Sequence, residues 1–371
     1  MISGSQAREA GKNRLLIQVV PRLTPGRCGV SDQVVLLARE LKVQFRTDSA
    51  FIVLNSSALC GLEHPVIHCA PLQLLENCLK LADGRSDAIL VHVSGYGYSA
   101  DGAPALLADA LDDVRANSEF PIAVYFHETF ASGPPWRSAF WYSWRQKKAI
   151  DRIAAVSDLV MTSNRLYGDM LAARGVSGVQ VLPVLSAAGE TCVPVPMDQR
   201  VPSMVVFGLP ATRQRAYQLL SSIEKNYLIN LGITEVLDIG RECGAPSNLS
   251  GVLVRRLGEQ SVADLGRLFS QAMFGFVSHL PSILAKSSIF ASYCALGAIP
   301  LLSEPFTGEI DGLTDGVQVI SPDTVDLVKD SGFGPCSLAA WKWYSEHNLR
   351  AYATGIRDWT IHARSRRAEI A

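Results

Sequence analysis

Short runs of consecutive apolar residues recur along this chain, and each is followed by a segment whose apolar residues return with helical spacing. The first run, Leu15 to Val20, precedes a loop and then the helical pattern of Gln33 to Val43. Strands that are apolar on both faces are typical of a parallel sheet covered by helices. Further strands are expected at 51–54, 66–68, 88–93, 121–126, 159–162 and 179–184. The alternation predicts a doubly wound α/β domain.

One segment interrupts this alternation. Residues 186–202 contain three prolines and show neither a helical nor a strand period, which favours a linker. The pattern then restarts, with strands expected at 204–207, 236–239, 252–255, 272–277, 298–302 and 317–320, and a helix over 341–359. The 371 residues also exceed one ordinary hydrophobic core. We therefore predict two Rossmann-like, doubly wound parallel-sheet domains, at 1–190 and 200–340, with ligands bound in the cleft between them.

Composition narrows the class of protein. The formal net charge is −1, so no overall field attracts nucleic acid, and we expect no nucleic-acid partner. No apolar run approaches the roughly 20 residues that span a bilayer, and the first ten residues lack the apolar core of a signal peptide. The eight cysteines form no CxxC pair and no zinc-finger spacing, which favours a cytoplasmic protein without a metal site. Contact with a membrane surface stays open.

Polar side chains stand where two expected strands end. One strand carries His92 and runs into a glycine-rich loop that contains Tyr96, and the next runs directly into His127 and Glu128. Ligands of open α/β sheets bind beyond the carboxyl ends of the strands. A histidine beside a carboxylate suits acid–base chemistry or hydrogen bonding to a ligand. The alternative is a structural histidine that pairs with a backbone carbonyl.

A second candidate site lies at the start of a helix, where Lys286, Ser287 and Ser288 are consecutive. The unpaired backbone N–H groups and the positive dipole end of a helix start suit an anion such as phosphate. A lysine and two hydroxyl groups strengthen that preference. In the alternative interpretation, the serines only cap the helix and the lysine is solvated.

Two arginines and a glycine complete the expected phosphate site. Arg213 and Arg215 stand at the head of the first helix of the second domain, and the planar fork of arginine suits phosphate oxygens. Because residues two apart on a helix point in different directions, one of the pair should face solvent, and Arg213 is the preferred contact. Gly29, in the first loop of the chain, would let the backbone approach a ligand.

In their order and spacing, several segments resemble the GT-B glycosyltransferases of the large group 1 family, which use nucleotide-sugar donors. The resemblance covers most of the chain and rests on PGRCGVSDQVVLLAREL, VYFHE, VVFGLPATRQRAY and FVSHLPSILAKSSIFASYCALGAIPLLS. It implies a C-terminal helix, over 341–371, that crosses back to the first domain. It also implies transfer of a sugar, without a metal or another cofactor, onto a glycan or glycolipid acceptor in surface polysaccharide biosynthesis.

The resemblance also implies roles for the candidate residues. His127 would stand close to the acceptor or the transferred sugar. Glu128, or Asp32 in the first loop, would be a base if the reaction inverts the configuration of the sugar. The loops that follow His92 and include Tyr96 would lie on the acceptor side. The expected donor-side residues are Gly29, Arg213, Arg215, Lys286, Ser287 and Ser288.

The chain departs from the family at two positions. Retaining members carry two glutamates on the donor loop and helix, and Leu284 and Ser292 stand at those positions here. The departure leaves open whether the reaction retains or inverts configuration. It also motivates two other hypotheses: a GT-B-like protein that binds a nucleotide or glycan without catalysis, and a nucleotide-sugar epimerase. The aromatic loops SGYGY and PPWRSAFWYSW favour an acceptor groove, and therefore a transferase, over the epimerase.

Overall fold

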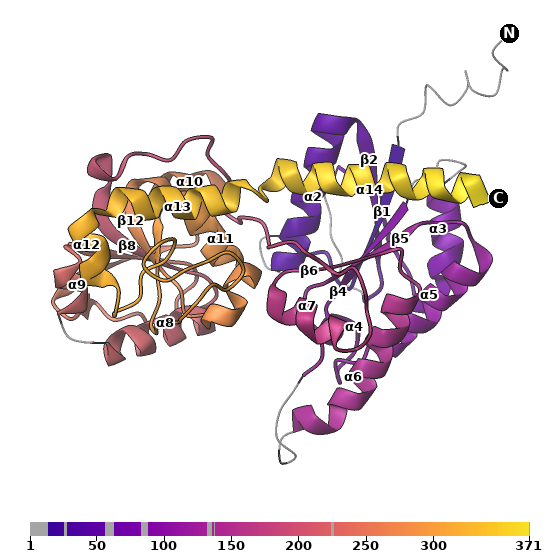
Figure 1. Ribbon diagram of the computed structural model, residues 1–371, viewed down its shortest axis with the longest axis horizontal. Helices are drawn as coiled ribbons and strands as arrows, with labels where there is room; N and C mark the ends of the chain where they lie inside the picture. The colour runs from indigo at the N-terminus through magenta and orange to yellow at the C-terminus, as the bar shows by residue number, and fades with distance from the viewer. Residues whose placement is uncertain are drawn as a thin grey trace, which may run out of the picture. The chain divides into compact units, whose positions relative to one another are not determined.

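The computed structural model describes residues 14–25, 28–55, 63–82, 88–131, 136, 138–223 and 226–370. They form two compact units. The first contains the described residues up to 182 together with 349–370, and the second contains those of 183–348. Each unit is a sheet, parallel or mostly parallel, with helices on both faces (Figure 1). This architecture confirms the predicted fold class of two Rossmann-like α/β domains.

The sheet of the first unit has seven parallel strands in the order β3-β2-β1-β4-β5-β6-β7. Their bounds are β1 Arg14–Val20, β2 Thr47–Val53, β3 Val66–His68, β4 Ala88–Val93, β5 Ile122–Phe126, β6 Leu159–Thr162 and β7 Gln180–Val181. The strand order reverses between β1 and β4, which is therefore the switch point where ligands bind in such sheets. The strand expected at 179–184 ends early because Pro183 has no N–H for the ladder.

Helices cover both faces of this sheet. Their bounds are α2 Gly29–Phe45, α3 Leu74–Ala82, α4 Gly95–Tyr98, α5 Ala105–Asn117, α6 Ser138–Ala155, α7 Arg165–Ala172 and α14 Leu349–Ile370, with a 3-10 turn η1 at Pro71–Gln73. Alternate strand residues such as Ile17, Val91 and Val124 pack against α3, α5 and α6. Residues of the opposite parity, such as Val20, pack against α2. Helix α14 contacts α2 and places the Tyr352 ring beside that of Tyr125.

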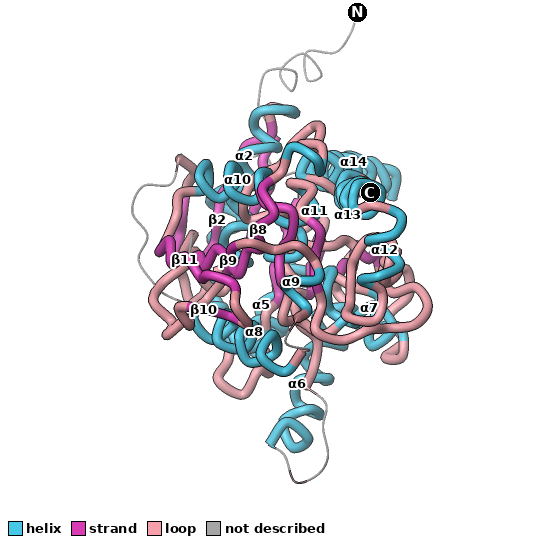
Figure 2. The backbone as a smooth tube through the Cα atoms, turned by 90° about the vertical axis from the view of Figure 1, so that its left-hand side faces the viewer, coloured by secondary structure: helices cyan, strands magenta, loops and turns pink. Residues whose placement is uncertain are grey.

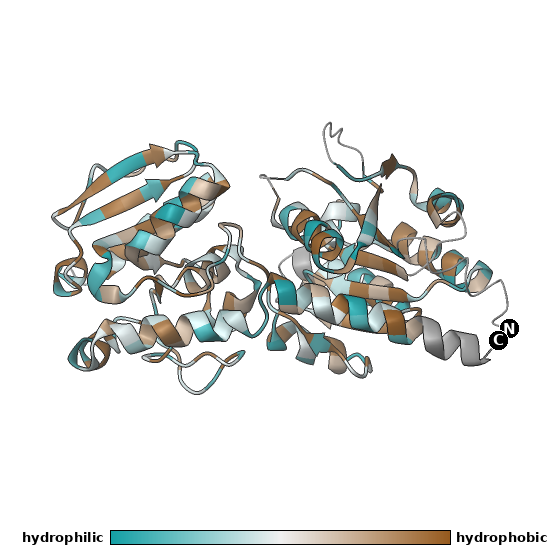
Figure 3. Cartoon of the chain, turned by 90° about the horizontal axis from the view of Figure 1, so that it is seen from above, coloured by the Kyte–Doolittle hydropathy of each residue, from teal (hydrophilic) through white to brown (hydrophobic). Residues whose placement is uncertain are grey.

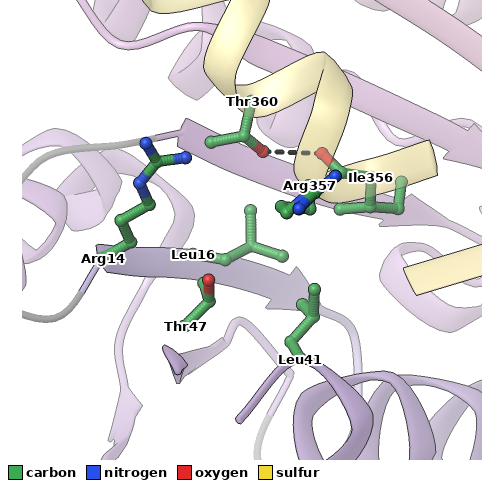
Figure 4. Close-up of a pocket in the computed structure, with 7 residues that line it drawn as sticks. All are labelled: Arg14, Leu16, Leu41, Thr47, Ile356, Arg357 and Thr360. Carbon is green, nitrogen blue, oxygen red and sulfur yellow. Dashed lines mark hydrogen bonds between the residues drawn. The ribbon is translucent and has the colours of Figure 1, made fainter. Parts of the chain in front are cut away.

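A small cavity lies beneath α14 (Figure 4). It holds about 10 Å³, roughly the room of one water molecule. The Thr47 hydroxyl, which has no hydrogen-bond partner among the described residues, is one of its lining groups. The lining residues are Arg14, Leu16, Leu41, Thr47, Ile356, Arg357 and Thr360. Because Arg14 and Thr47 begin their strands, the cavity lies at the edge of the sheet opposite to the switch point, and we interpret it as a packing gap.

The sheet of the second unit has six strands in the order β10-β11-β9-β8-β12-β13, parallel except for the β10–β11 pair. Their bounds are β8 Val201–Phe207, β9 Glu235–Ile239, β10 Asn248–Leu249, β11 Val252–Gly258, β12 Ala272–Phe276 and β13 Ile299–Leu301. The switch point lies between β8 and β12, where the order reverses. The strand expected at 317–320 forms only isolated bridges, because Gly316 and Val319 close a turn there.

The helices of the second unit form a layer on each face of the sheet. Figure 2 shows α8 and α9 on one side of β8 and β9, and α10, α11 and α13 on the other. Their bounds are α8 Pro210–Ser222, α9 Tyr227–Asn230, α10 Val262–Gln271, α11 Ser288–Ala295, α12 Val325–Ser331 and α13 Phe333–Ser345, with 3-10 turns η2 at Met197–Gln199 and η3 at Pro281–Lys286. Figure 3 shows helices with both hydrophobic and hydrophilic residues, as expected for segments that bury one face.

The helix expected over 341–359 is two helices. Helix α13 ends at Ser345 in the second unit, and α14 begins at Leu349 in the first. Between them the His347 ring packs against Trp343, with ring centroids 4.5 Å apart, and its backbone N–H bonds to the carbonyl of Tyr344. This anchored turn separates the two helices, although apolar spacing continues through it.

Candidate functional site

The switch point of the first unit brings Gln18, His92 and His127 together. Gln18 lies in β1, His92 is the next-to-last residue of β4, and His127 follows β5. The Nε2 atom of His92 is 3.2 Å from Oε1 of Gln18, and its Nδ1 atom is 3.1 Å from Nε2 of His127. All three side chains are buried. A continuous polar chain therefore crosses three neighbouring strands on the sheet face that α2 covers.

The hydrogen bonds of this chain determine where its protons lie. The Gln18 amide group donates from Nε2 to the carbonyl of Val34, 3.4 Å away, and to the Ser49 hydroxyl, 3.5 Å away. Its Oε1 atom must then accept from Nε2–H of His92. Burial lowers the pKa of His92 to about 3, so the ring is neutral and Nδ1 is an acceptor. His127 must therefore donate from Nε2 to this acceptor.

The buried neutral state of His92 predicts a pH dependence of stability. An unfolded histidine titrates near pH 6.5, whereas the folded pKa of His92 is about 3. Between these values the unfolded chain holds a proton that the folded chain lacks, so stability is fully present above pH 6.5 and falls as the pH drops. Urea unfolding at pH 7 and pH 5 should show this fall, and His92→Gln should reduce it. An unchanged pH dependence in the variant would contradict the assignment.

The other residues expected in the first unit differ in their exposure to solvent. Tyr96, in the short helix α4, is exposed, and its hydroxyl accepts a bond from Gln146 Nε2 at 3.5 Å. Glu128 is half-buried and follows His127 directly. Gly29 is exposed and is the first residue of α2. In the second aromatic loop, Pro134, Pro135 and Arg137 lie outside the described residues.

The switch point of the second unit gathers basic side chains. His279 lies in the loop after β12, and Lys286 ends the η3 turn that precedes α11. Burial lowers the pKa of His279 below its ordinary value, and the positive charges of Lys286 and Arg215 lower it further. The positive charges of two of the expected cations, Lys286 and Arg215, therefore both act on the same histidine. A nearby anion would relieve the repulsion among them.

Ser287 connects this basic cluster to the start of α11. Its hydroxyl accepts a bond from the N–H of Phe290 at 3.2 Å, which makes it the N-cap, and lies 3.3 Å from Nδ1 of His279. Because the oxygen already accepts from Phe290, its hydrogen is placed to donate to His279. Ser288 is the half-buried first residue of the helix. Ser287 therefore caps the helix and also contacts His279.

Leu284 and Ser292 occupy buried positions. Leu284 is a core residue. The Ser292 hydroxyl donates to the carbonyl of Ser288 at 2.6 Å and accepts from the N–H of Ala187 at 2.9 Å. Ser292 therefore connects α11 to the segment that enters the second unit.

The two arginines of α8 have opposite environments. Arg213 is fully buried, and its Nη1 atom pairs with Oδ2 of Asp238 at 2.5 Å. Its Nε atom donates to the carbonyl of Gly208 at 3.1 Å. Arg215 is exposed and lies near enough to His279 to lower its pKa. The preference for Arg213 as the ligand contact is therefore not supported by its position, and the accessible cation of the pair is Arg215.

Arg213 instead connects two loops at the carboxyl edge of the sheet. The loop after β8 contains Gly208, with φ +131°, and the loop after β9 contains Gly240, with φ +134°. A Cβ atom at Gly240 would come within 2.6 Å of the Gly208 carbonyl oxygen and 3.1 Å of Arg213 Nε. Only glycine fits this close approach. The ion pair with Asp238 on β9 holds both loops in place.

Sequence reasoning missed Gln18 and His279. Gln18 is the one polar residue in the apolar run LLIQVV, and a polar residue in a buried strand needs a hydrogen-bond partner. His279 follows its strand closely, as His127 follows β5. Both signals were present in the sequence.

No protein-family model matches the chain, and no curated protein matches it in sequence. Several solved structures resemble it across nearly its whole length. An alpha-glucosyltransferase, solved with UDP and a 13-mer DNA containing an HMU base, is 11% identical with a TM-score of 0.58, over 95% of this chain and 100% of that one. A trehalose-phosphate synthase (UDP-forming) from Burkholderia vietnamiensis is 11% identical with a TM-score of 0.57, over 94% and 97%.

A putative UDP-N-acetylglucosamine 2-epimerase from Listeria monocytogenes is 10% identical with a TM-score of 0.57, over 94% of this chain and 96% of that one. At such identities the likeness concerns the fold and not the reaction. The likeness to the glycosyltransferases and to the epimerase covers 94–95% of this chain. It therefore extends over both units and both sheets. The chain therefore has the GT-B fold, as its resemblance to the group 1 glycosyltransferases implied.

Proposed function

We propose that this chain is a glycosyltransferase that moves a sugar from a nucleotide-sugar donor to a glycan or glycolipid acceptor in surface polysaccharide biosynthesis. The basic cluster of Arg215, His279 and Lys286 at the start of α11 carries the proposal. When the sugar leaves a nucleoside diphosphate, negative charge develops on the diphosphate. Cations and N–H groups that are already in place stabilise that charge.

The donor is proposed to be a uridine diphosphate sugar. UDP appears in the names of the alpha-glucosyltransferase complex and of the trehalose-phosphate synthase, both of which share the fold. The positive side chains of Arg215 and Lys286 would offset the diphosphate charge without a metal ion. Ser287, Ser288 and the first N–H groups of α11 would add hydrogen bonds to the phosphate oxygens.

His127 is proposed to hold the transferred sugar. Nε2–H of His127 donates to Nδ1 of His92, and His92 in turn donates from Nε2 to Oε1 of Gln18. These bonds orient Nε2 of His127 toward the protein interior. In a neutral His127 ring, Nδ1 would accept a hydrogen bond from a sugar hydroxyl. In this role His92 is a positioning residue, because it determines the tautomer of His127 and does not touch the sugar. Glu128 is proposed as the base if the reaction inverts.

The first test is a thermal-shift panel of nucleotide sugars, followed by turnover assays with mixed acceptors in EDTA and in Mg²⁺. A true donor should raise the melting temperature further as its concentration is increased above its dissociation constant. It should then release nucleoside diphosphate equally well in EDTA. Binding without turnover of any donor would favour the non-catalytic hypothesis and overturn the transferase proposal.

The epimerase is the second candidate, since a putative UDP-N-acetylglucosamine 2-epimerase shares the fold. Incubation with UDP-N-acetylglucosamine and no acceptor distinguishes the two reactions. An epimerase would form the 2-epimer with the diphosphate still attached, whereas a transferase leaves the sugar configuration at C2 unchanged.

Lys286→Ala is expected to weaken binding of UDP by about 10- to 100-fold, the usual effect of losing a charge-assisted hydrogen bond. Uridine, which has no phosphate, should bind the variant as it binds the wild type. Isothermal titration with both ligands measures the difference. Lys329→Ala is the matched control, because Lys329 lies on α12 and its ammonium donates to the exposed carbonyl of Asn230 at 3.0 Å. Equal losses for UDP and uridine would remove Lys286 from the phosphate site.

A further inference from the structure

Exposed aromatic side chains gather at the N-terminal end of α6. Trp136, just before the helix, is 84% exposed, and Trp141 and Trp144 are 65% and 64% exposed. Phe140 and Tyr142 are exposed as well. We call these five residues the aromatic tip. It holds three of the six tryptophans of the chain, and contiguous exposed apolar groups of this kind mark interaction sites.

The tip faces solvent because α6 buries its other side. Gln146, Ile150 and Ile153 are buried against the first unit, whereas Trp141, Trp144 and Lys148 recur at intervals of three and four on the outer face. Figures 1 and 2 both show the beginning of α6 projecting from the body of this unit. Within the tip, the rings of Phe140 and Trp141 pack edge to face, 5.5 Å between centroids.

Cationic side chains follow the tip along the helix. Residues 138–150 contain Arg145, Lys147 and Lys148 and no acidic residue, although the chain as a whole has a net charge of −1. Arg145 is about half exposed and reaches Asp101 at 3.1 Å. Lys147 lies over the Phe130 ring at 4.9 Å, and Lys148 is exposed one turn beyond Trp144. Aromatic groups therefore come first and positive charges one to two turns later.

This order fits the chemistry of a membrane–water interface. Tryptophan and tyrosine collect at that interface because their rings are apolar and their N–H or O–H groups are polar. Lysine and arginine near an anionic bilayer each contribute about 1 kcal/mol of attraction. Among the residues that the structure describes, no helix is long and apolar enough to cross a bilayer.

We propose that the aromatic tip docks the first unit on an anionic lipid surface. Trp136, Trp141 and Trp144 would lie at the level of the headgroups, with Lys148 and Arg145 against the lipid phosphates. The docking is independent of the proposed transferase activity, because it needs neither donor nor acceptor.

The test is sedimentation of the full chain with vesicles of phosphatidylcholine alone or with added phosphatidylglycerol. The wild type should bind the anionic vesicles and release them in high salt. Brominated acyl chains should quench its tryptophan fluorescence. The triple variant Trp136→Ser, Trp141→Ser, Trp144→Ser should lose at least about tenfold in partitioning, and its three remaining tryptophans should escape quenching. Lys148→Glu should weaken binding to the anionic vesicles by reversing one charge.

A matched control removes equally exposed apolar side chains from other parts of the first unit: Val43→Ser, Leu72→Ser and Leu106→Ser. This variant should bind vesicles as the wild type does. Failure of the wild type to bind anionic vesicles in low salt, or unchanged binding of the triple tryptophan variant, would overturn the proposal. So would self-association in lipid-free light scattering that the tryptophan substitutions abolish, because a second copy of the chain would then be the partner.

Discussion

Replacing Arg213 by methionine is expected to destabilise the second unit by about 3–5 kcal/mol, the usual cost of breaking a buried ion pair from one side. The variant leaves the buried Asp238 carboxylate without its cationic partner, and the Tyr217 hydroxyl still donates to its Oδ1 atom at 2.7 Å. It also removes the bond from Arg213 to the Gly208 carbonyl. In a unit of this size the melting temperature should fall by roughly 6–20 °C.

The control for this experiment is Arg241→Met, which breaks the exposed ion pair with Glu259 on the same sheet edge. Exposed pairs of this kind contribute at most about 1 kcal/mol, so its melting temperature should change little. The double variant Arg213→Met, Asp238→Leu removes both charges and should recover much of the lost stability. A single Arg213 variant as stable as the wild type would show that the pair does not hold these loops.

Replacing His127 by alanine is expected to lower kcat by about 100-fold or more, in the range that one positioned polar group contributes to a transition state. Affinity for UDP should stay within about twofold, because the proposed phosphate site is in the second unit. Steady-state kinetics and UDP titration on the same preparations separate the two effects. Normal turnover with an intact fold would remove His127 from the site.

The role of His92 requires a measurement other than activity. In the wild type, ¹⁵N NMR of the imidazole groups should show His127 protonated at Nε2. His92→Phe keeps an aromatic ring of similar size but removes the acceptor, so His127 should exchange between tautomers and kcat should fall less than in His127→Ala. The surface variant His68→Phe, on the short edge strand β3, should leave the His127 spectrum unchanged. An unchanged tautomer in His92→Phe would contradict the positioning role.

The fold was predictable because the apolar pattern of each short segment indicates whether it forms a strand or a helix. Runs such as LLIQVV and AILVHV are apolar enough to specify interior strands, and the helical spacing between them specifies crossovers, which parallel sheets require. The prediction was wrong at 341–359, where apolar spacing continues through the turn at His347. The spacing of apolar residues predicts which face of a helix is buried. It does not predict whether the first or the second unit buries that face.

The candidate site was predictable only in part, because burial is decided by distant contacts. Arg213 and Arg215 look alike in sequence, and only Asp238, 25 residues from Arg213, decides that Arg213 is the buried one. Strand ends drew attention to His92 and His127, but the order β1-β4-β5 that makes Gln18 their partner is a property of the sheet. A polar residue at the end of one strand can be recognised in the sequence. Hydrogen bonds that join side chains of three strands depend on the strand order, which the sequence of one strand does not contain.

The position of α14 has a consequence for how the chain folds during synthesis. The second unit is continuous, from 183 to 348, and all its strands leave the ribosome before α14 does. The first unit is complete only when α14 has emerged, since Tyr352, Ala353 and Ile356 are buried within it. Domains commonly fold in the order of their synthesis. Here the strands of the first unit are synthesised first, but this unit lacks α14 until after the second unit has been synthesised. Until α14 is synthesised, the surface of the first unit that it covers stays exposed to solvent and to other proteins.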